Sequence, residues 1–92
     1  IQLDSLMRAE AVNPDHPAHE YAVGLARRFR AQLRADLAAE QAAGRIREDL
    51  DLELTATQLV ALIEGVQSEW LLDRSVDMAA VVRSFAEDLR AT

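Results

Sequence analysis

The sequence predicts an all-helical protein that is one small domain or a piece of a larger one. Alanine, the strongest helix former, is frequent, and only three glycines and two prolines interrupt the 92 residues. Apolar residues recur at spacings of three and four along most of the chain, whereas no stretch alternates apolar and polar residues as a strand does. We therefore expect an antiparallel helical bundle that ends in a C-terminal helical hairpin.

Composition narrows the range of functions. The net charge of −6 argues against direct contact with DNA or RNA, because phosphate binding needs clustered cations. The chain has no cysteine, so it forms no disulfide and gives no sign of an oxidising compartment. No apolar run approaches the ~18–20 residues of a membrane span, and the first residues lack a basic leader. These features predict a cytoplasmic protein without membrane contact.

Residues 1–12 carry Leu3, Leu6 and Met7 at helical spacing but have no residue that caps a helix N-terminus. They indicate the end of a helix that begins upstream, so we expect the chain to be the C-terminal part of a larger domain. Residues 13–17 contain two prolines and break this helix.

The second predicted helix runs from Pro17 to Ala43. Asp15 or His16 can cap it, with Pro17 at the favoured first position, and Gly44 can end it in a left-handed conformation. These ~27 residues span roughly 40 Å, which exceeds the roughly 30 Å breadth of a compact domain of this length. The helix therefore needs neighbours along its length. Its apolar stripe consists of Tyr21, Leu25, Phe29, Leu33 and Leu37.

The third predicted helix runs from Leu52 to Leu72, after a short polar connection, and is capped by Asp49 or Asp51. It carries two apolar stripes on different sides. A helix that is apolar on more than one face must be covered from more than one direction. The main stripe is Leu59, Leu62, Ile63, Val66 and Trp70, and the second is Ala56, Val60 and Leu71.

The last predicted helix runs from Met78 to Arg90, with Asp77 as its cap. Because residues 73–77 leave only a short connection, the third and last helices should form an antiparallel hairpin. Because the third helix is apolar on two sides, we further expect this hairpin to pair with a second copy of the chain in a homodimer. The apolar stripe of the last helix is Met78, Val81, Val82, Phe85 and Leu89.

Four single residues on these helices each have two interpretations. Gly65 costs about 1 kcal/mol inside a helix, so a close helix crossing is favoured over a tolerated glycine. Glu64 either points into solvent, the favoured reading, or is a buried carboxylate that meets a ligand or an arginine. Tyr21 and Trp70 are more often core residues than ligand contacts, although each combines an apolar body with a polar tip.

No residue set indicates catalysis or a resident metal. His16, His19 and Glu20 are the nearest approach to a metal site, but Pro17 lies between the histidines and a capping or surface role is favoured. The chain lacks a cysteine nucleophile, a plausible Ser–His–Asp set and a glycine-rich phosphate loop. We expect no cofactor, no metal and no enzymatic activity.

An ordered series of short segments resembles the C-terminal regulatory domain of tetracycline-repressor (TetR) family transcriptional regulators. The segments cover most of the chain; they are residues 16–21 (HPAHEY), 44–51 (GRIREDLD), 55–66 (TATQLVALIEGV), 70–72 (WLL) and 76–78 (VDM). One departure is Leu52, where many relatives have proline after the capping aspartate.

The resemblance implies a partner and two sites. In this family the last two helices of each subunit form an intersubunit four-helix bundle, which here implies Leu52–Leu72 and Met78–Arg90. The implied dimer seam is Leu59, Leu62, Ile63, Val66, Val81, Val82 and Phe85. The family also binds an effector inside each regulatory domain, and the implied lining is Tyr21, Leu25, Phe29, Glu64, Gln67 and Trp70.

The resulting expectation is a ligand-sensing and homodimerisation domain of a bacterial TetR-like regulator. An unidentified small-molecule effector would modulate DNA binding, and DNA would be contacted only through an N-terminal helix-turn-helix domain that these residues do not include. The alternative is a plain helical dimerisation module without an effector pocket.

Overall fold

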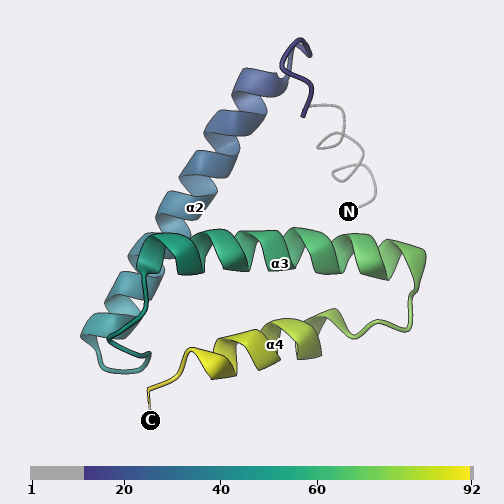
Figure 1. Cartoon of the computed structure of the whole chain (residues 1–92). Coiled ribbons are helices and arrows are strands. Elements are labelled where there is room, and N and C mark those ends of the chain that lie inside the picture. Colours follow the sequence, from purple (N-terminus) through teal and green to yellow (C-terminus); the bar gives the residue numbers. More distant parts are fainter. Residues whose placement is uncertain (1–11, 92) are drawn as a thin grey trace.

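The computed structural model describes residues 12–91, which form three α-helices and no extended strand (Figure 1). They are α2 (His19–Ala42), α3 (Leu52–Leu72) and α4 (Met78–Asp88). The all-helical fold class predicted from the sequence is thereby confirmed. Leu3, Leu6 and Met7 of the first predicted helix lie outside the described residues.

The start of α2 differs from the prediction. Pro17 is not the first residue of the helix. The helix begins at His19, and its N-cap residue, Ala18, makes no side-chain cap hydrogen bond. Residues 13–18 instead form turns, in which the backbone N–H of His16 donates to the carbonyl of Asn13 and that of His19 to the carbonyl of His16. The His16 ring contributes as well, because its Nδ1 accepts from the backbone N–H of Ala18 at 3.0 Å. These local bonds give hydrogen-bond acceptors to the backbone N–H groups of His16, Ala18 and His19, which have none within the helix.

Helix α2 ends at Ala42, one residue before the predicted Ala43, and Gly44 closes it as predicted. Gly44 has a φ of +78°, the left-handed conformation in which glycine has no steric penalty. Its N–H donates to the carbonyl of Gln41, and the N–H of Arg45 donates to the carbonyl of Glu40, each at 3.0 Å. This pair of bonds is a Schellman motif, which satisfies carbonyls at the helix end and turns the chain back toward the core.

The caps of the two later helices come from aspartates, as predicted. Asp51, rather than Asp49, caps α3, and its carboxylate accepts from the backbone N–H of Leu54 at 3.2 Å. Asp77 caps α4 and accepts from the backbone N–H of Ala80 at 3.0 Å. Both bounds of α3 agree with the sequence.

Helix α4 ends at Asp88, two residues before the predicted end. The N–H groups of Leu89 and Arg90 bond three residues back, to the carbonyls of Ala86 and Glu87. The chain then becomes extended, and Arg90 forms an isolated antiparallel bridge with Ile46 in the α2–α3 connection. Arg90 therefore pairs with the backbone of Ile46 instead of continuing the helix.

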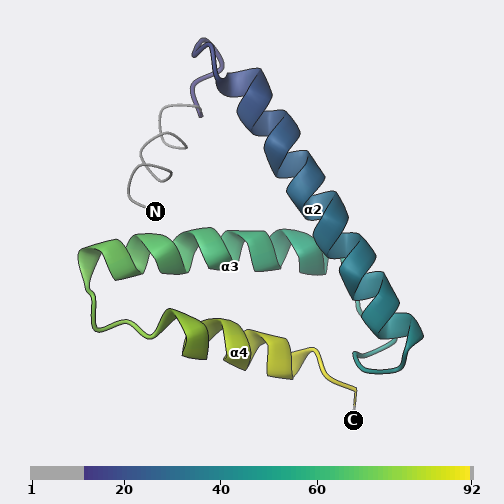
Figure 2. The same ribbon diagram turned by 180° about the vertical axis from the view of Figure 1, so that it is seen from behind.

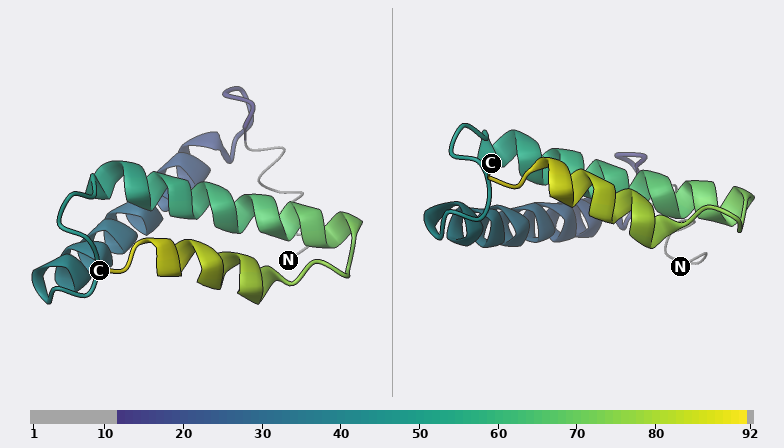
Figure 3. Two further views of the ribbon diagram at one scale, coloured as in Figure 1. Left: turned by 60° about the horizontal axis from the view of Figure 1, so that its bottom comes forward. Right: turned by 90° about the horizontal axis from the view of Figure 1, so that it is seen from below.

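The three helices lie in a flat, open arrangement. The molecule measures 44 × 33 × 14 Å. Helix α2 crosses α3 near the start of α3 and then diverges from it (Figures 1 and 2). Helices α3 and α4 run side by side in opposite directions, as the predicted hairpin requires (Figure 3). The helices pack together mainly at this crossing and in this hairpin, so each helix keeps exposed faces.

The core sits where the end of α2, the start of α3 and the end of α4 converge. Its buried members are Leu37, Ile46, Ala56 and Leu89, and the partly buried residues packed against them are Leu33, Leu50, Leu52 and Phe85. Ile46 corrects the description of residues 45–50 as a polar connection, because its side chain is buried. Ile46 and Leu50 lie in a connection outside the helices, where helical periodicity does not apply, so their burial depends on the fold around them.

Candidate functional site

The apolar stripe of α2 is covered at one end only. The exposed fraction falls from 69% at Tyr21 to 46% at Leu25, 40% at Phe29 and 8% at Leu37. The decline follows the geometry, because the C-terminal part of α2 packs against α3 and the N-terminal part diverges from it (Figure 1). Three large apolar side chains therefore form an uncovered strip on the N-terminal half of the helix.

The other three predicted ligand-contact residues lie on the second half of α3. Glu64, Gln67 and Trp70 are all half-buried. The guanidinium carbon of Arg74 lies 3.8 Å from the centroid of the Trp70 ring, a cation–π contact at the end of the helix.

The described elements do not bring these two groups together. The N-terminal half of α2 and the C-terminal half of α3 lie on diverging arms that meet only at the crossing (Figures 1 and 2). The α2 residues Tyr21, Leu25 and Phe29 and the α3 residues therefore stand as two separate surfaces within residues 12–91.

Most of the residues expected at a dimer seam are at least partly buried by the chain itself. Val66 is buried, and Phe85 packs against the core. Val81 is exposed. The remaining four, which are half-buried, are Leu59, Leu62, Ile63 and Val82.

Gly65 makes no close helix crossing within the described chain. A Cβ placed on Gly65 would meet no atom within 4 Å, and the residue is exposed. The close crossing predicted from Gly65 therefore does not occur between α3 and either α2 or α4.

The histidines near the start of α2 take part in the turn structure. The Nδ1 of His16 accepts from the backbone, as described above. Among residues 12–91, no group of three or more His, Cys, Asp or Glu side chains is placed to hold a metal ion. None of the described helices combines the length and apolar content that crossing a membrane requires.

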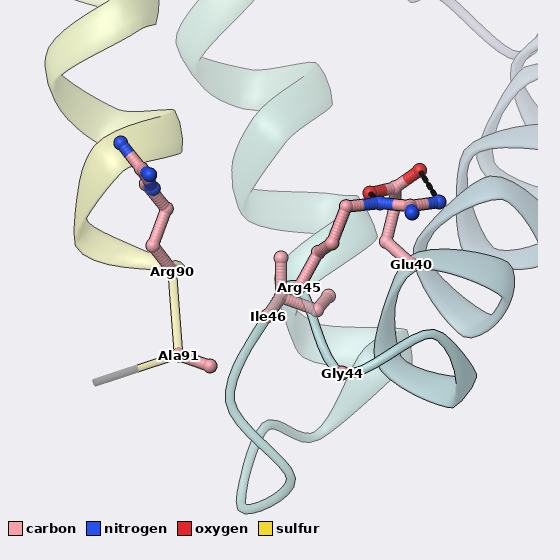
Figure 4. A pocket seen from close by; sticks show the side chains of 6 residues that line it. All are labelled: Glu40, Gly44, Arg45, Ile46, Arg90 and Ala91. Atoms are coloured by element: carbon pink, nitrogen blue, oxygen red, sulfur yellow. Dashed lines mark hydrogen bonds and ion pairs between the residues drawn. The ribbon is translucent and has the colours of Figure 1, made fainter.

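A shallow hollow of about 390 Å³, which the sequence did not predict, lies beside the Ile46–Arg90 bridge (Figure 4). It forms because the left-handed turn at Gly44 carries the α2–α3 connection past the extended end of the chain. Its lining residues are Glu40, Gly44, Arg45, Ile46, Arg90 and Ala91.

An ion pair occupies one wall of this hollow. Both the Nε and the Nη2 of Arg45 donate to the Glu40 carboxylate, the latter at 3.1 Å (Figure 4). The side-chain hydrogen bond from Arg45 lowers the pKa of Glu40, and the same bond raises the pKa of Arg45. These bonds join the last turn of α2 to the α2–α3 connection.

Comparison with known families decides the assignment. The sequence profile of the C-terminal domain of BetI-type transcriptional repressors, a TetR-family group, matches residues 5–91. The chain belongs to this family. It is therefore the C-terminal domain of a TetR-family transcriptional regulator, as the resemblance of its motifs implied. TetR-type regulatory domains regulate transcription and are not enzymes.

The matched region contains α2, the α3–α4 hairpin and the connection that carries the hollow. Comparisons with curated proteins and with solved structures gave no match.

Proposed function

We propose that this TetR-type domain senses a small molecule and pairs with a second copy of itself. Through both events it controls DNA binding by a helix-turn-helix domain of the same regulator. The observation that carries the sensing part is the uncovered strip of Tyr21, Leu25 and Phe29 on α2. Exposed clusters of large apolar side chains mark interaction surfaces, and a tyrosine adds a hydroxyl that can orient a ligand.

The proposed effector would bind against this strip, and the α2–α3 crossing would carry its effect to the hairpin. Arg34 Nε lies 3.0 Å from Glu53 Oε1 and joins the two helices near the crossing. The core at the same corner joins both helices to the end of α4. An effector regulates DNA binding only if it binds the DNA-bound and released states with different affinity, and the effect is reciprocal.

The test uses the intact regulator and the DNA upstream of its own coding region. A library of small apolar and aromatic molecules is screened for release of this DNA in a fluorescence anisotropy assay. Tyr21→Ala and Phe29→Ala are expected to weaken the response to any active compound at least tenfold while leaving DNA affinity without compound unchanged. The matched control is Val12→Ala, which truncates an exposed apolar side chain outside α2.

Equal responses of wild type, Tyr21→Ala and Phe29→Ala would remove α2 from the sensing site. A regulator that binds its DNA but responds to no compound would favour the alternative, a dimerisation module without an effector pocket.

A further inference from the structure

The uncovered strip of Tyr21, Leu25 and Phe29 lies in a strongly basic part of an acidic chain. Residues 21–35 contain four arginines and no acidic residue, although the whole chain carries a net charge of −6. A molecule bound on this half of α2 would therefore meet a positive potential from the helix itself. The sign of this local charge bears on which molecules the strip can accept.

One of the four arginines lies beside the strip. Arg28 follows Leu25 by three residues and Tyr21 by seven, the spacings that place helical residues on one face. The other three follow each other at spacings of three and four residues and so share the opposite side of the helix. They are Arg27, Arg30 and Arg34.

The Arg28 side chain turns back along α2 toward the N-terminal end of the strip. Its Nη1 lies 3.4 Å from the position that a Cβ on Gly24 would occupy. Because Gly24 has no side chain, the guanidinium lies in the space beside it, one turn nearer the start of the helix than Arg28 itself. Tyr21 comes three residues before Gly24, so its side chain neighbours the same space. The guanidinium and the Tyr21 hydroxyl thus supply hydrogen-bond donors at this end of the strip.

The Arg28 guanidinium is available to a bound molecule. Arg28 is exposed and forms no ion pair with any described residue; the arginines that do are Arg34, Arg45 and Arg47. A guanidinium can donate two parallel hydrogen bonds to a carboxylate, and such charge-assisted bonds are about twice as strong as neutral ones. A cationic molecule on the strip would instead be repelled by the same charge.

The other end of the strip sets the direction in which a carboxylate would bind. Asp36 follows Phe29 by seven residues and lies on the same face, and its Oδ1 accepts from the Gln32 side chain at 3.0 Å. An anionic group is therefore favoured at the Arg28 end and disfavoured at the Asp36 end. An apolar body attached to that group would lie along Leu25 and Phe29, toward the α2–α3 crossing.

We propose that the strip binds an apolar carboxylate. Arg28 and Tyr21 hold the carboxylate group, and Leu25 and Phe29 contact the apolar body. The inference rests on the sensing role in the proposed function and narrows the effector to one chemical class. Arg28 determines specificity, because it distinguishes carboxylates from neutral and cationic molecules that have the same apolar body.

The test measures binding to the intact regulator by isothermal titration calorimetry, with probes that differ only in charge. Phenylbutyrate, phenylbutanamide and phenylbutylamine share an aromatic body, and hexanoate, hexanamide and hexylamine repeat the comparison with an aliphatic one. At least one carboxylate is expected to bind about tenfold more tightly than its amide, because a hydrogen bond to a charged group contributes more than a neutral one. The amines should bind most weakly. Raising the salt concentration should reduce the preference for the carboxylate, since Arg28 is exposed.

Two variants assign the preference to one side chain. Arg28→Gln should weaken binding of the carboxylate about tenfold and leave binding of the amide within about twofold. Arg27→Gln is the matched control, because it removes the same charge from the neighbouring residue on another side of α2. It should keep the preference. Both residues are exposed, so the helix content of each variant by circular dichroism should equal that of wild type.

The outcomes separate this proposal from the sensing role. If no carboxylate binds more tightly than its amide, or if Arg27→Gln and Arg28→Gln weaken carboxylate binding equally, the carboxylate site is overturned. The sensing role stands in that case if Tyr21→Ala and Phe29→Ala still weaken the response to an active compound. If these two variants leave both the binding of every probe and the response to every compound unchanged, the carboxylate site and the sensing role of the strip are both overturned.

Discussion

Ile46 and Arg90 form an antiparallel backbone bridge that fastens the end of α4 to the α2–α3 connection. On either side of the pair, the N–H of Arg47 donates to the carbonyl of Leu89 at 2.9 Å and the N–H of Ala91 donates to the carbonyl of Arg45 at 3.0 Å. The bridge places the buried side chains of Ile46 and Leu89 in one core with Leu37. The three helices are thus held together at the corner where their ends converge.

Replacing Gly44 with alanine should destabilise the domain by about 1–2 kcal/mol, because an L-residue pays this amount in the left-handed region. Gly44 has a φ of +78°, and a Cβ there would meet no neighbour within 4 Å, so the cost is conformational rather than steric. Urea unfolding followed by circular dichroism measures the change. Gly24→Ala in the interior of α2 is the control, and it should stabilise the helix by up to about 1 kcal/mol. Equal effects at the two glycines would contradict the assigned turn.

Removing a capping carboxylate should lower the free energy of unfolding more than removing the neighbouring carboxylate of Asp49. Asp51→Ala and Asp77→Ala should each lower the free energy of unfolding by about 1 kcal/mol, because the first-turn N–H groups of Leu54 and Ala80 lose their acceptor. Asp49→Ala is the comparison, because Asp49 makes only an exposed ion pair with Arg47 at 3.6 Å. The same urea experiment distinguishes them, and a larger loss at Asp49 than at Asp51 would reverse the assignment of the α3 cap.

The stability cost of truncating side chains in the apolar stripe of α2 should show which part of the stripe α3 covers. Leu37→Ala should cost about 2–5 kcal/mol, since Leu37 is part of the buried core. Leu25→Ala should cost far less, because its side chain is 46% exposed and loses little contact. Thermal unfolding of the two variants gives the comparison. A cost at Leu25 as large as that at Leu37 would show that the N-terminal half of α2 is also covered.

The ion pair of Glu40 and Arg45 should contribute to the pH dependence of stability at acid pH. The hydrogen bond from Arg45 lowers the pKa of Glu40 from its ordinary value of 4.5, so the unfolded state binds a proton first as the pH falls. The contribution is therefore present above pH 4.5 and is lost as the pH falls through the lower pKa of the folded state. In Arg45→Gln, the Glu40 pKa measured by NMR titration should rise toward its ordinary value. An unchanged pKa in this variant would exclude Arg45 as the cause.

The sequence alone determined the helical class, both bounds of α3, the aspartate caps of α3 and α4 (with Asp49 left as an alternative to Asp51) and Gly44 at the end of α2, whereas it misplaced the start of α2. These features depend on local interactions: the aspartates before α3 and α4 bond to backbone within three residues, and Gly44 follows its own helix. The motifs between residues 16 and 78 also identified the TetR family, which the match over residues 5–91 confirmed.

The tertiary structure decided which apolar residues are buried. Periodicity assigned Tyr21 and Leu37 to one stripe, yet one is exposed and the other buried, because α3 crosses α2 instead of following it. Ile46 became a core residue, and Arg90 left its helix, through a bridge between segments more than forty residues apart. Helical periodicity records which residues share a face of one helix, whereas the angles between helices determine which part of that face is covered.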